Sequence, residues 1–156
     1  MNSIKYLIEF KYFIFFTMKF EDNTRTRNHY IGDLNYHIIF STKFRRKCLS
    51  NIENELYDAF RYCESKSHFK IKTMKQDKDH IHLLVNIKPT YSLGQTINRM
   101  KQMTTNYLYR NERSRLWLRK FYWAKRLTVW THGYFASTIG QVSEEIVWNY
   151  IENQGK

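Results

Sequence analysis

Two histidines stand two residues apart in the run DKDHIHLLVNI, which covers residues 77–87. Side chains alternate between the two faces of a strand, so His80 and His82 share one face, and the apolar residues Ile81, Leu83 and Val85 share the other. Two imidazoles at this spacing can reach one metal ion. Two polar residues on a solvated sheet face have the same pattern, and the spacing alone leaves both interpretations open.

A metal ion needs more than two ligands, and the end of the chain, EEIVWNYIENQGK, supplies a candidate. Gln154 follows Tyr150 by four residues, so both lie on one face of a predicted helix. Imidazole nitrogens with an amide oxygen and open positions suit Mg²⁺ or Mn²⁺ better than a closed structural zinc site. Asp77 and Asp79 flank the first histidine and are either further ligands or turn formers.

Tyr150 is the candidate nucleophile. A phenol beside a metal ion can attack a phosphodiester and form a covalent phosphotyrosine, while the metal neutralises the developing charge. The alternative is structural: Tyr150 follows Ile146 by four residues and has the spacing of a residue at the edge of the core.

The charge predicts an anionic partner. The 156 residues include 26 Lys and Arg against 14 Asp and Glu, a formal charge of +12, which favours nucleic acid or an acidic membrane surface. In two basic segments, 43–47 and 110–130, cations can contact phosphates, and the aromatic residues of the second segment either stack on unpaired bases or dock on the protein. The candidate DNA-binding residues are Lys43, Arg45, Arg46, Lys47, Arg119, Lys120, Lys125 and Arg126.

The elements that must position these residues follow from periodicity and capping signals. Strands are predicted at 34–41, 69–73, 80–87 and 133–139. Ser50 with Glu53 and Ser92 with Gln95 have the spacing of capping boxes that open two helices, the first ending near residue 66. A last helix, capped by Ser143, runs to about Gln154. This order predicts an α+β fold, a ferredoxin-like (RRM-like) βαββαβ antiparallel sheet with an additional C-terminal helix that carries the nucleophile.

The N-terminal run YLIEFKYFIFFTMKF is apolar, but Glu9, Lys11 and Lys19 interrupt it. Its uninterrupted part is shorter than the roughly 20 residues that a membrane helix needs, and it has no cleavage site of a signal peptide. We therefore expect an N-terminal extension over residues 1–28, a single domain over 29–156, and no membrane partner, with a surface anchor as the alternative. The two cysteines provide neither a disulfide framework nor a zinc motif, so we expect a cytoplasmic protein.

Four blocks resemble a known family. NYHIIFSTKFRRKCL, DKDHIHLLV, GYFASTIG and NYIENQ follow one another between residues 30 and 154, and they are similar to the single-tyrosine HUH transposases of small bacterial insertion sequences, the group that includes REP-associated tyrosine transposases. The resemblance implies that His80 and His82 are the metal-binding pair and Gln154 the third ligand. It also implies that Tyr150 is the nucleophile and Tyr134 a structural strand residue.

The same resemblance implies the reaction and the partners. The expected substrate is single-stranded DNA with subterminal hairpins at the ends of a mobile element, and cleavage leaves a 5′-phosphotyrosine and a 3′-hydroxyl that later attacks the other junction. The expected assembly is a homodimer in which the tyrosine helix of one subunit serves the histidine pair of the other. DNA transposition, a form of DNA recombination, is thus the expected process.

Two other functions fit parts of the pattern. A non-catalytic, single-stranded nucleic-acid-binding module of RRM-like fold has the same element order, but such modules carry stacking aromatics on their central strands, where this chain has His80 and His82. An HUH replication initiator or relaxase is the second alternative. Those proteins are commonly larger, and NYIENQ fits them poorly.

Overall fold

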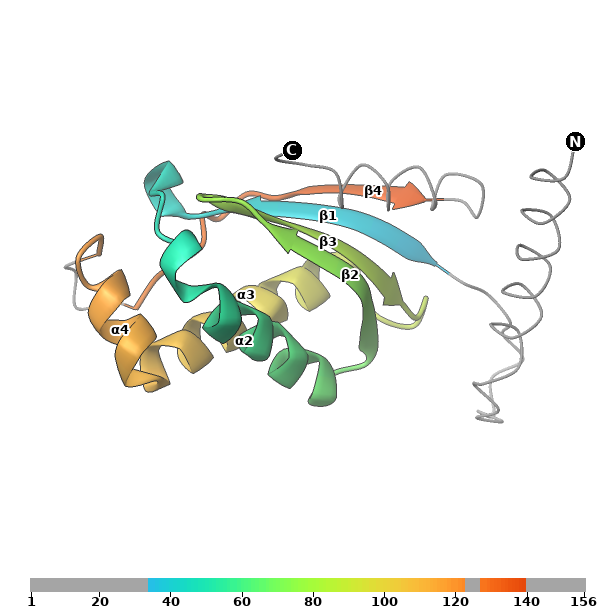
Figure 1. Ribbon diagram of the computed structural model, residues 1–156. Coiled ribbons are helices and arrows are strands. Elements are labelled where there is room, and N and C mark those ends of the chain that lie inside the picture. Colours follow the sequence, from blue (N-terminus) through green and yellow to red (C-terminus); the bar gives the residue numbers. More distant parts are fainter. Residues whose placement is uncertain (1–33, 123–126, 140–156) are drawn as a thin grey trace, which may run out of the picture. The chain divides into compact units, whose positions relative to one another are not determined.

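The computed structural model describes residues 34–122 and 127–139, which form an antiparallel sheet with helices on one face (Figure 1). The strands are β1 (Asn35–Ser41), β2 (Phe69–Gln76), β3 (His80–Ile87) and β4 (Phe135–Ile139). Their order across the sheet is β2-β3-β1-β4, and each neighbouring pair is antiparallel. This is the order of the ferredoxin-like βαββαβ arrangement, so the predicted fold class is confirmed.

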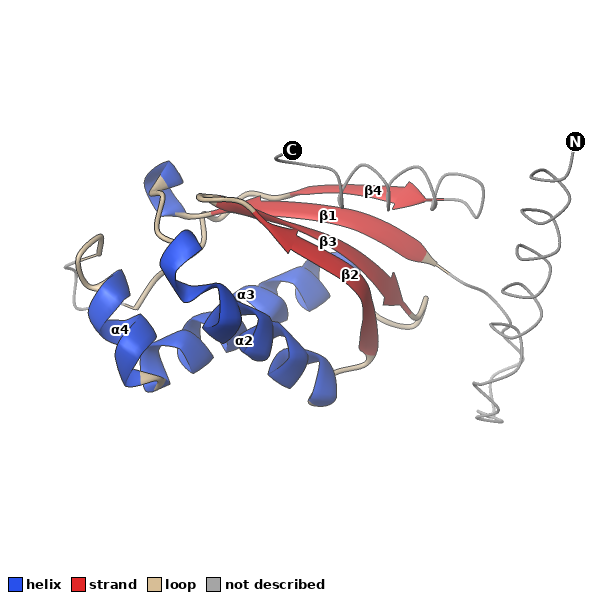
Figure 2. Ribbon diagram, in the orientation of Figure 1, coloured by secondary structure: helices blue, strands red, loops and turns tan. Residues whose placement is uncertain are grey.

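The helices are α2 (Glu53–Ser65), α3 (Leu93–Arg110) and α4 (Glu112–Leu118), with 3₁₀ turns at Lys43–Arg45 and Ser50–Ile52. Figure 2 shows α2 and α3 lying together beneath the sheet. Helix α4 falls inside the basic segment 110–130, where no helix is predicted from the sequence, because seven residues carry too little periodicity to be recognised.

One of the two predicted capping boxes forms its N-cap bond. The Ser92 side chain accepts a hydrogen bond from the backbone N–H of Gln95 and begins α3. The prediction at Ser50 is wrong, because Ser50–Ile52 form a 3₁₀ turn in which the Ile52 N–H donates to the Leu49 carbonyl at 3.0 Å. The tighter turn satisfies backbone donors without a side-chain cap, so α2 begins at Glu53, two residues later than predicted.

The last predicted strand also begins later than expected, at Phe135 rather than at Gly133. The Lys101 ammonium donates to the backbone carbonyls of Thr131, His132 and Gly133 at 3.1, 2.9 and 2.8 Å. These carbonyls bind a side chain of α3 instead of a neighbouring strand, which delays the start of β4.

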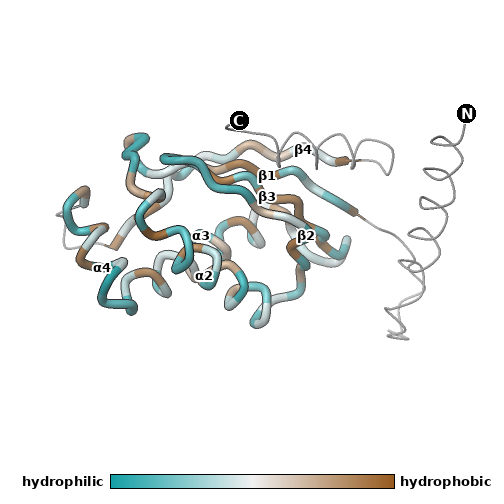
Figure 3. The backbone as a smooth tube through the Cα atoms, viewed as in Figure 1, coloured by the Kyte–Doolittle hydropathy of each residue, from teal (hydrophilic) through white to brown (hydrophobic). Residues whose placement is uncertain are grey.

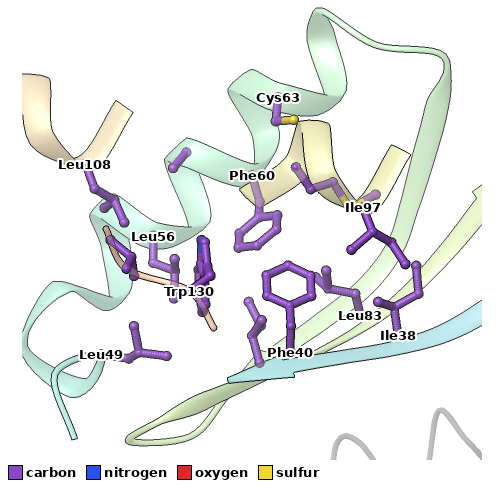
Figure 4. Packing of buried hydrophobic residues seen from close by; sticks show 14 of the residues in the cluster. Ile38, Phe40, Leu49, Leu56, Phe60, Cys63, Leu83, Ile97, Leu108 and Trp130 are labelled. Carbon is purple, nitrogen blue, oxygen red and sulfur yellow. The ribbon is translucent and has the colours of Figure 1, made fainter. Parts of the chain in front are cut away.

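The core lies between the sheet and the helices (Figure 4). Phe40 of β1, Phe60 of α2 and Trp130 meet at its centre, and the Phe40 and Trp130 ring centroids are 4.8 Å apart with an interplanar angle of 89°. Figure 3 shows the amphipathic alternation along α2 and α3, with apolar residues recurring at helical spacing. One face of the sheet therefore packs in the core, and the candidate site lies on the other face.

Several predicted features lie outside the described residues. These are the N-terminal extension over 1–28, the last helix with Tyr150 and Gln154, and the cations Lys125 and Arg126. Within the part that the structure describes, no helix combines the length and apolarity required to cross a bilayer.

Candidate metal centre and nucleic-acid interface

The two histidines lie on the sheet face opposite the helices, as the alternation predicts. Ile81 and Leu83 are fully buried in the core between sheet and helices. In the register of the sheet, His82 pairs with Ile39 and His80 pairs with Ser41, and directly opposed residues share a face. The paired imidazoles therefore lie at the end of the sheet where β1 ends and β3 begins.

His82 is not a solvated surface residue, since only 3% of it is exposed. Its Nδ1 lies 3.1 Å from Nε2 of His37 on β1, and the two rings stack with centroids 5.4 Å apart. Burial, followed by repulsion from His80 and His37, lowers the pKa of His82 to about 4. Burial also lowers the pKa of His37, so both imidazoles are neutral at pH 7.

His80 is held by a carboxylate. Its Nδ1 lies 2.8 Å from Oδ1 of Asp79, and the other Asp79 oxygen lies 3.1 Å from Nε of Arg45. An ionised carboxylate only accepts hydrogen bonds, so Nδ1 of His80 is the donor. Asp79 thus orients the first imidazole. Asp77 accepts a hydrogen bond from the Lys78 N–H at 2.6 Å and forms the turn between β2 and β3.

The donor set fits a divalent cation. Metal-ligating histidines usually donate the second ring N–H to a carboxylate or another acceptor, which fixes the ring and its tautomer. With Nδ1 of both rings hydrogen-bonded to Asp79 and His37, Nε2 is the nitrogen through which His80 and His82 would bind a metal. No group of three or more His, Cys, Asp and Glu side chains suited to a metal ion occurs in residues 34–122 and 127–139.

The sequence pattern does not indicate His37 and Arg45 as parts of this site. His37 sits 45 residues before His82 in the chain, and no spacing rule connects them. The one available signal is that His37 interrupts the apolar run of β1 on the same face that carries the histidine pair of β3.

Tyr134, the competing tyrosine, lies on the helix side of the sheet. Its ring centroid is 5.3 Å from the Lys101 ammonium of α3, and its hydroxyl approaches Gly94 at the start of that helix. The histidine pair lies on the opposite face, so Tyr134 does not face it. The residue immediately precedes β4, although the predicted strand 133–139 contained it.

The basic residues of the first segment are on the surface, and the aromatics of the second largely are not. Tyr122 is buried and donates its hydroxyl proton to the Lys43 carbonyl at 3.0 Å, and the Trp117 indole N–H donates to the Cys48 carbonyl at 2.7 Å. These rings dock on the protein, the second of the two interpretations left open above. The predicted cations that the structure describes are all exposed: Lys43, Arg45, Arg46, Lys47, Arg119 and Lys120.

Solved transposase structures have the same fold. A putative transposase from Deinococcus radiodurans R1 superposes with a TM-score of 0.64 at 21% identity, over 84% of this chain and 98% of that one. A REP-associated tyrosine transposase bound to a REP hairpin superposes with a TM-score of 0.53 at 12% identity, over 83% of this chain and 68% of that one. These likenesses show that the chain has the fold of these proteins.

The family model described as IS200-like transposase matches residues 30–154, and the chain belongs to this family. The transposases for insertion sequence element IS200 of Salmonella typhimurium strain LT2 and Salmonella typhi are each 28% identical over 121 residues, which is 76% of this chain and 75% of each relative. The family predicted from the four sequence blocks is therefore confirmed.

Proposed function

We propose that the chain is a divalent-metal-dependent tyrosine transposase, which cleaves and rejoins single-stranded DNA at the ends of an insertion sequence. The observation that carries this proposal is the orientation of the His80 and His82 imidazoles. Asp79 and His37 lie 2.8 and 3.1 Å from Nδ1 of His80 and His82, and a fixed partner on the second ring nitrogen is usual for metal-ligating histidines. Two polar residues on a solvated face would need neither the burial of His82 nor these fixed partners.

The reaction is a transesterification with Tyr150 as the nucleophile. The Tyr150 hydroxyl loses its proton and attacks the scissile phosphorus, so a new O–P bond forms and the bond from phosphorus to the 3′ oxygen breaks. The departing 3′ oxygen takes up a proton and becomes a 3′-hydroxyl, and the 5′ phosphate remains on the tyrosine. A later attack by another 3′-hydroxyl reverses this exchange, so no external energy source is needed.

The proposed cation is Mg²⁺ or Mn²⁺, held by His80, His82 and Gln154. When bound, it supplies a positive charge that polarises the scissile phosphate. Imidazole and amide ligands with open positions suit these ions. The residues of the chain would fix the imidazoles through Asp79 and His37, and the exposed cations of the loop 43–47 would hold the DNA backbone.

The proposed partner is single-stranded DNA with subterminal hairpins, bound by a homodimer that shares its active sites. The solved REP-associated tyrosine transposase with this fold is bound to a hairpin, which supports the hairpin as the DNA element. In the register of the sheet, Lys75 of β2 is the partner of His82 and shares its face. A cation at this place is suited to a phosphate delivered to the histidine pair.

A labelled DNA strand that carries a hairpin tests the proposed function. With Mg²⁺ or Mn²⁺, the wild-type protein is expected to become covalently labelled, and the label should survive denaturing electrophoresis because the phosphotyrosine bond is covalent. A metal chelator should prevent labelling. Equal labelling with and without chelator would contradict the metal requirement, and no labelling of any hairpin strand would contradict the reaction.

Binding of the same DNA is expected to depend steeply on salt. Between about 50 and 200 mM salt, the affinity should fall by about 10- to 300-fold, because each neutralised phosphate releases counterions. Lys47→Gln should reduce the salt slope by about 0.7 in the logarithmic plot. Arg61→Gln removes the same charge from α2, where Arg61 pairs with Glu64, and should leave the slope unchanged. Equal slopes for wild type and Lys47→Gln would exclude Lys47 as a phosphate contact.

A further inference from the structure

The loop that follows β1 holds an aromatic ring in the solvent. Phe44 is 74% exposed, the largest value among the exposed large hydrophobic side chains of the described chain. Four cations stand next to it in the sequence, Lys43, Arg45, Arg46 and Lys47, all of them exposed. An apolar ring in such surroundings gains nothing from the core and needs another explanation.

The backbone at this ring is in an unusual conformation. Phe44 has φ 60° and Arg45 has φ 53°, and these are the positive-φ residues other than glycine among the described residues. The left-handed region is unfavourable for bulky side chains, and glycine would adopt it without strain. Folding alone would therefore favour glycine at the position of this phenylalanine. Residues held in such strained conformations are concentrated at functional sites.

The surrounding loop is rigidly held. The Thr42 hydroxyl donates to the Arg46 carbonyl at 2.7 Å, and the Lys43 N–H donates to the Val129 carbonyl at 2.8 Å. The buried Tyr122 hydroxyl donates to the Lys43 carbonyl from the other side. A ring presented on a fixed backbone loses little conformational entropy on binding a ligand, which is the advantage of a pre-organised contact.

The loop that carries the ring is bonded to the candidate metal centre through Asp79. The Thr42 N–H donates to the Asp79 carbonyl at 2.8 Å, and the neighbour of Phe44, Arg45, forms the ion pair with Asp79 that in turn holds His80. The Lys43 ammonium lies 5.3 Å from the Phe44 ring centroid. A flat apolar surface, an adjacent cation and a nearby phosphate site have the composition that binds an unpaired nucleotide.

We propose that Phe44 stacks on an unpaired base of single-stranded DNA, and that this contact places the neighbouring phosphate at the histidine pair. The proposal deepens the proposed function and rests on it, since it takes single-stranded DNA as the substrate. Base stacking on an aromatic side chain is tolerant of sequence, because every base has a π-face. Phe44 would therefore set the position of the strand and leave base recognition to other residues.

The test compares two probes, a short oligo-thymidine strand and an abasic sugar–phosphate strand of the same length, with binding measured without divalent metal. For the wild type, removal of the bases should weaken binding by about 5- to 100-fold. Phe44→Ala should bind oligo-thymidine more weakly by about the same factor and the abasic strand as well as the wild type does. Phe44→Trp should bind both probes like the wild type, because it retains a stacking surface.

Two further variants test whether the loss of binding comes from lower stability or from the removal of any exposed ring. Phe44→Gly relieves the positive φ, so it should melt at or above the wild-type temperature and still bind oligo-thymidine as weakly as Phe44→Ala. Tyr91→Ala removes another exposed ring, which stacks on His68 beyond the far end of β3, and should bind like the wild type.

Oligo-thymidine binding by Phe44→Ala and Phe44→Gly within about twofold of the wild type would overturn the proposal, and so would an equal loss of affinity for both probes. The proposed function and the stacking role of Phe44 can be contradicted independently of each other. A wild type that forms no covalent adduct but loses base-dependent binding with Phe44→Ala contradicts the proposed function alone. A wild type that forms the adduct while Phe44→Ala binds oligo-thymidine normally contradicts the stacking role alone.

Discussion

Tyr150→Phe is expected to abolish the covalent adduct between the protein and a hairpin-bearing single strand. The substitution removes one oxygen atom, the nucleophile of the proposed reaction, and retains the ring. Because the other groups of a catalytic site cannot replace a missing nucleophile, adduct formation should fall on the order of 10³-fold or more. The measurement is the rate of covalent labelling in the presence of Mg²⁺ or Mn²⁺.

Tyr134→Phe is the matched control, since it removes the same oxygen from a tyrosine that packs against α3 on the helix side of the sheet. This variant should label at the wild-type rate, and both variants should bind DNA with unchanged affinity. The opposite pattern, in which Tyr134→Phe loses the adduct and Tyr150→Phe retains it, would show that Tyr150 is not the nucleophile.

Among the substitutions proposed for this protein, His82→Ala is expected to have the second largest effect on adduct formation. Removing even an outer partner of a metal ligand typically lowers metal affinity or activity by about 10- to 100-fold, so loss of a direct ligand should lower Mn²⁺ affinity by at least about 100-fold. Adduct formation should fall with it. Calorimetric titration of Mn²⁺ measures the first effect and covalent labelling the second.

The fold should survive this substitution. The lost contacts include the hydrogen bond with His37. Leaving a buried polar group unpaired costs about 1–3 kcal/mol against a typical total stability of about 5–15 kcal/mol. His68→Ala removes an imidazole that is exposed and stacks on Tyr91, and it should change neither metal binding nor labelling. Complete unfolding of His82→Ala would instead favour a structural role for His82.

Much of the fold follows from local patterns. The run from His80 to Ile87 alternates as a strand with one apolar face, and the structure has β3 over those residues. Ser92 caps its helix as predicted. The start of β4 differs because of a contact remote in sequence, since Lys101 binds the carbonyls that precede the strand. Such contacts produce no periodic pattern in the sequence from which they could be predicted.

The candidate site could likewise be predicted only in part from the sequence. His80 and His82 could be predicted because the two-residue period of a strand brings them to one face. His37, which holds His82, comes from another strand, and Arg45, which holds Asp79, comes from a loop. The contacts of His37 and Arg45 were thus not predictable, since the folding of the chain brings these residues to the site from distant positions in the sequence.

By itself, the sequence determined the family, the order of elements, the excess of positive charge and the face on which the histidine pair lies. These depend on residue type and short-range spacing, which backbone geometry translates directly into structure. Only the tertiary structure decided which imidazole is buried, which carboxylate is an orienting group, and that Phe44 is exposed on a left-handed backbone. The reason is physical: burial, pairing and strain are properties of the packed chain, set by residues far apart in sequence.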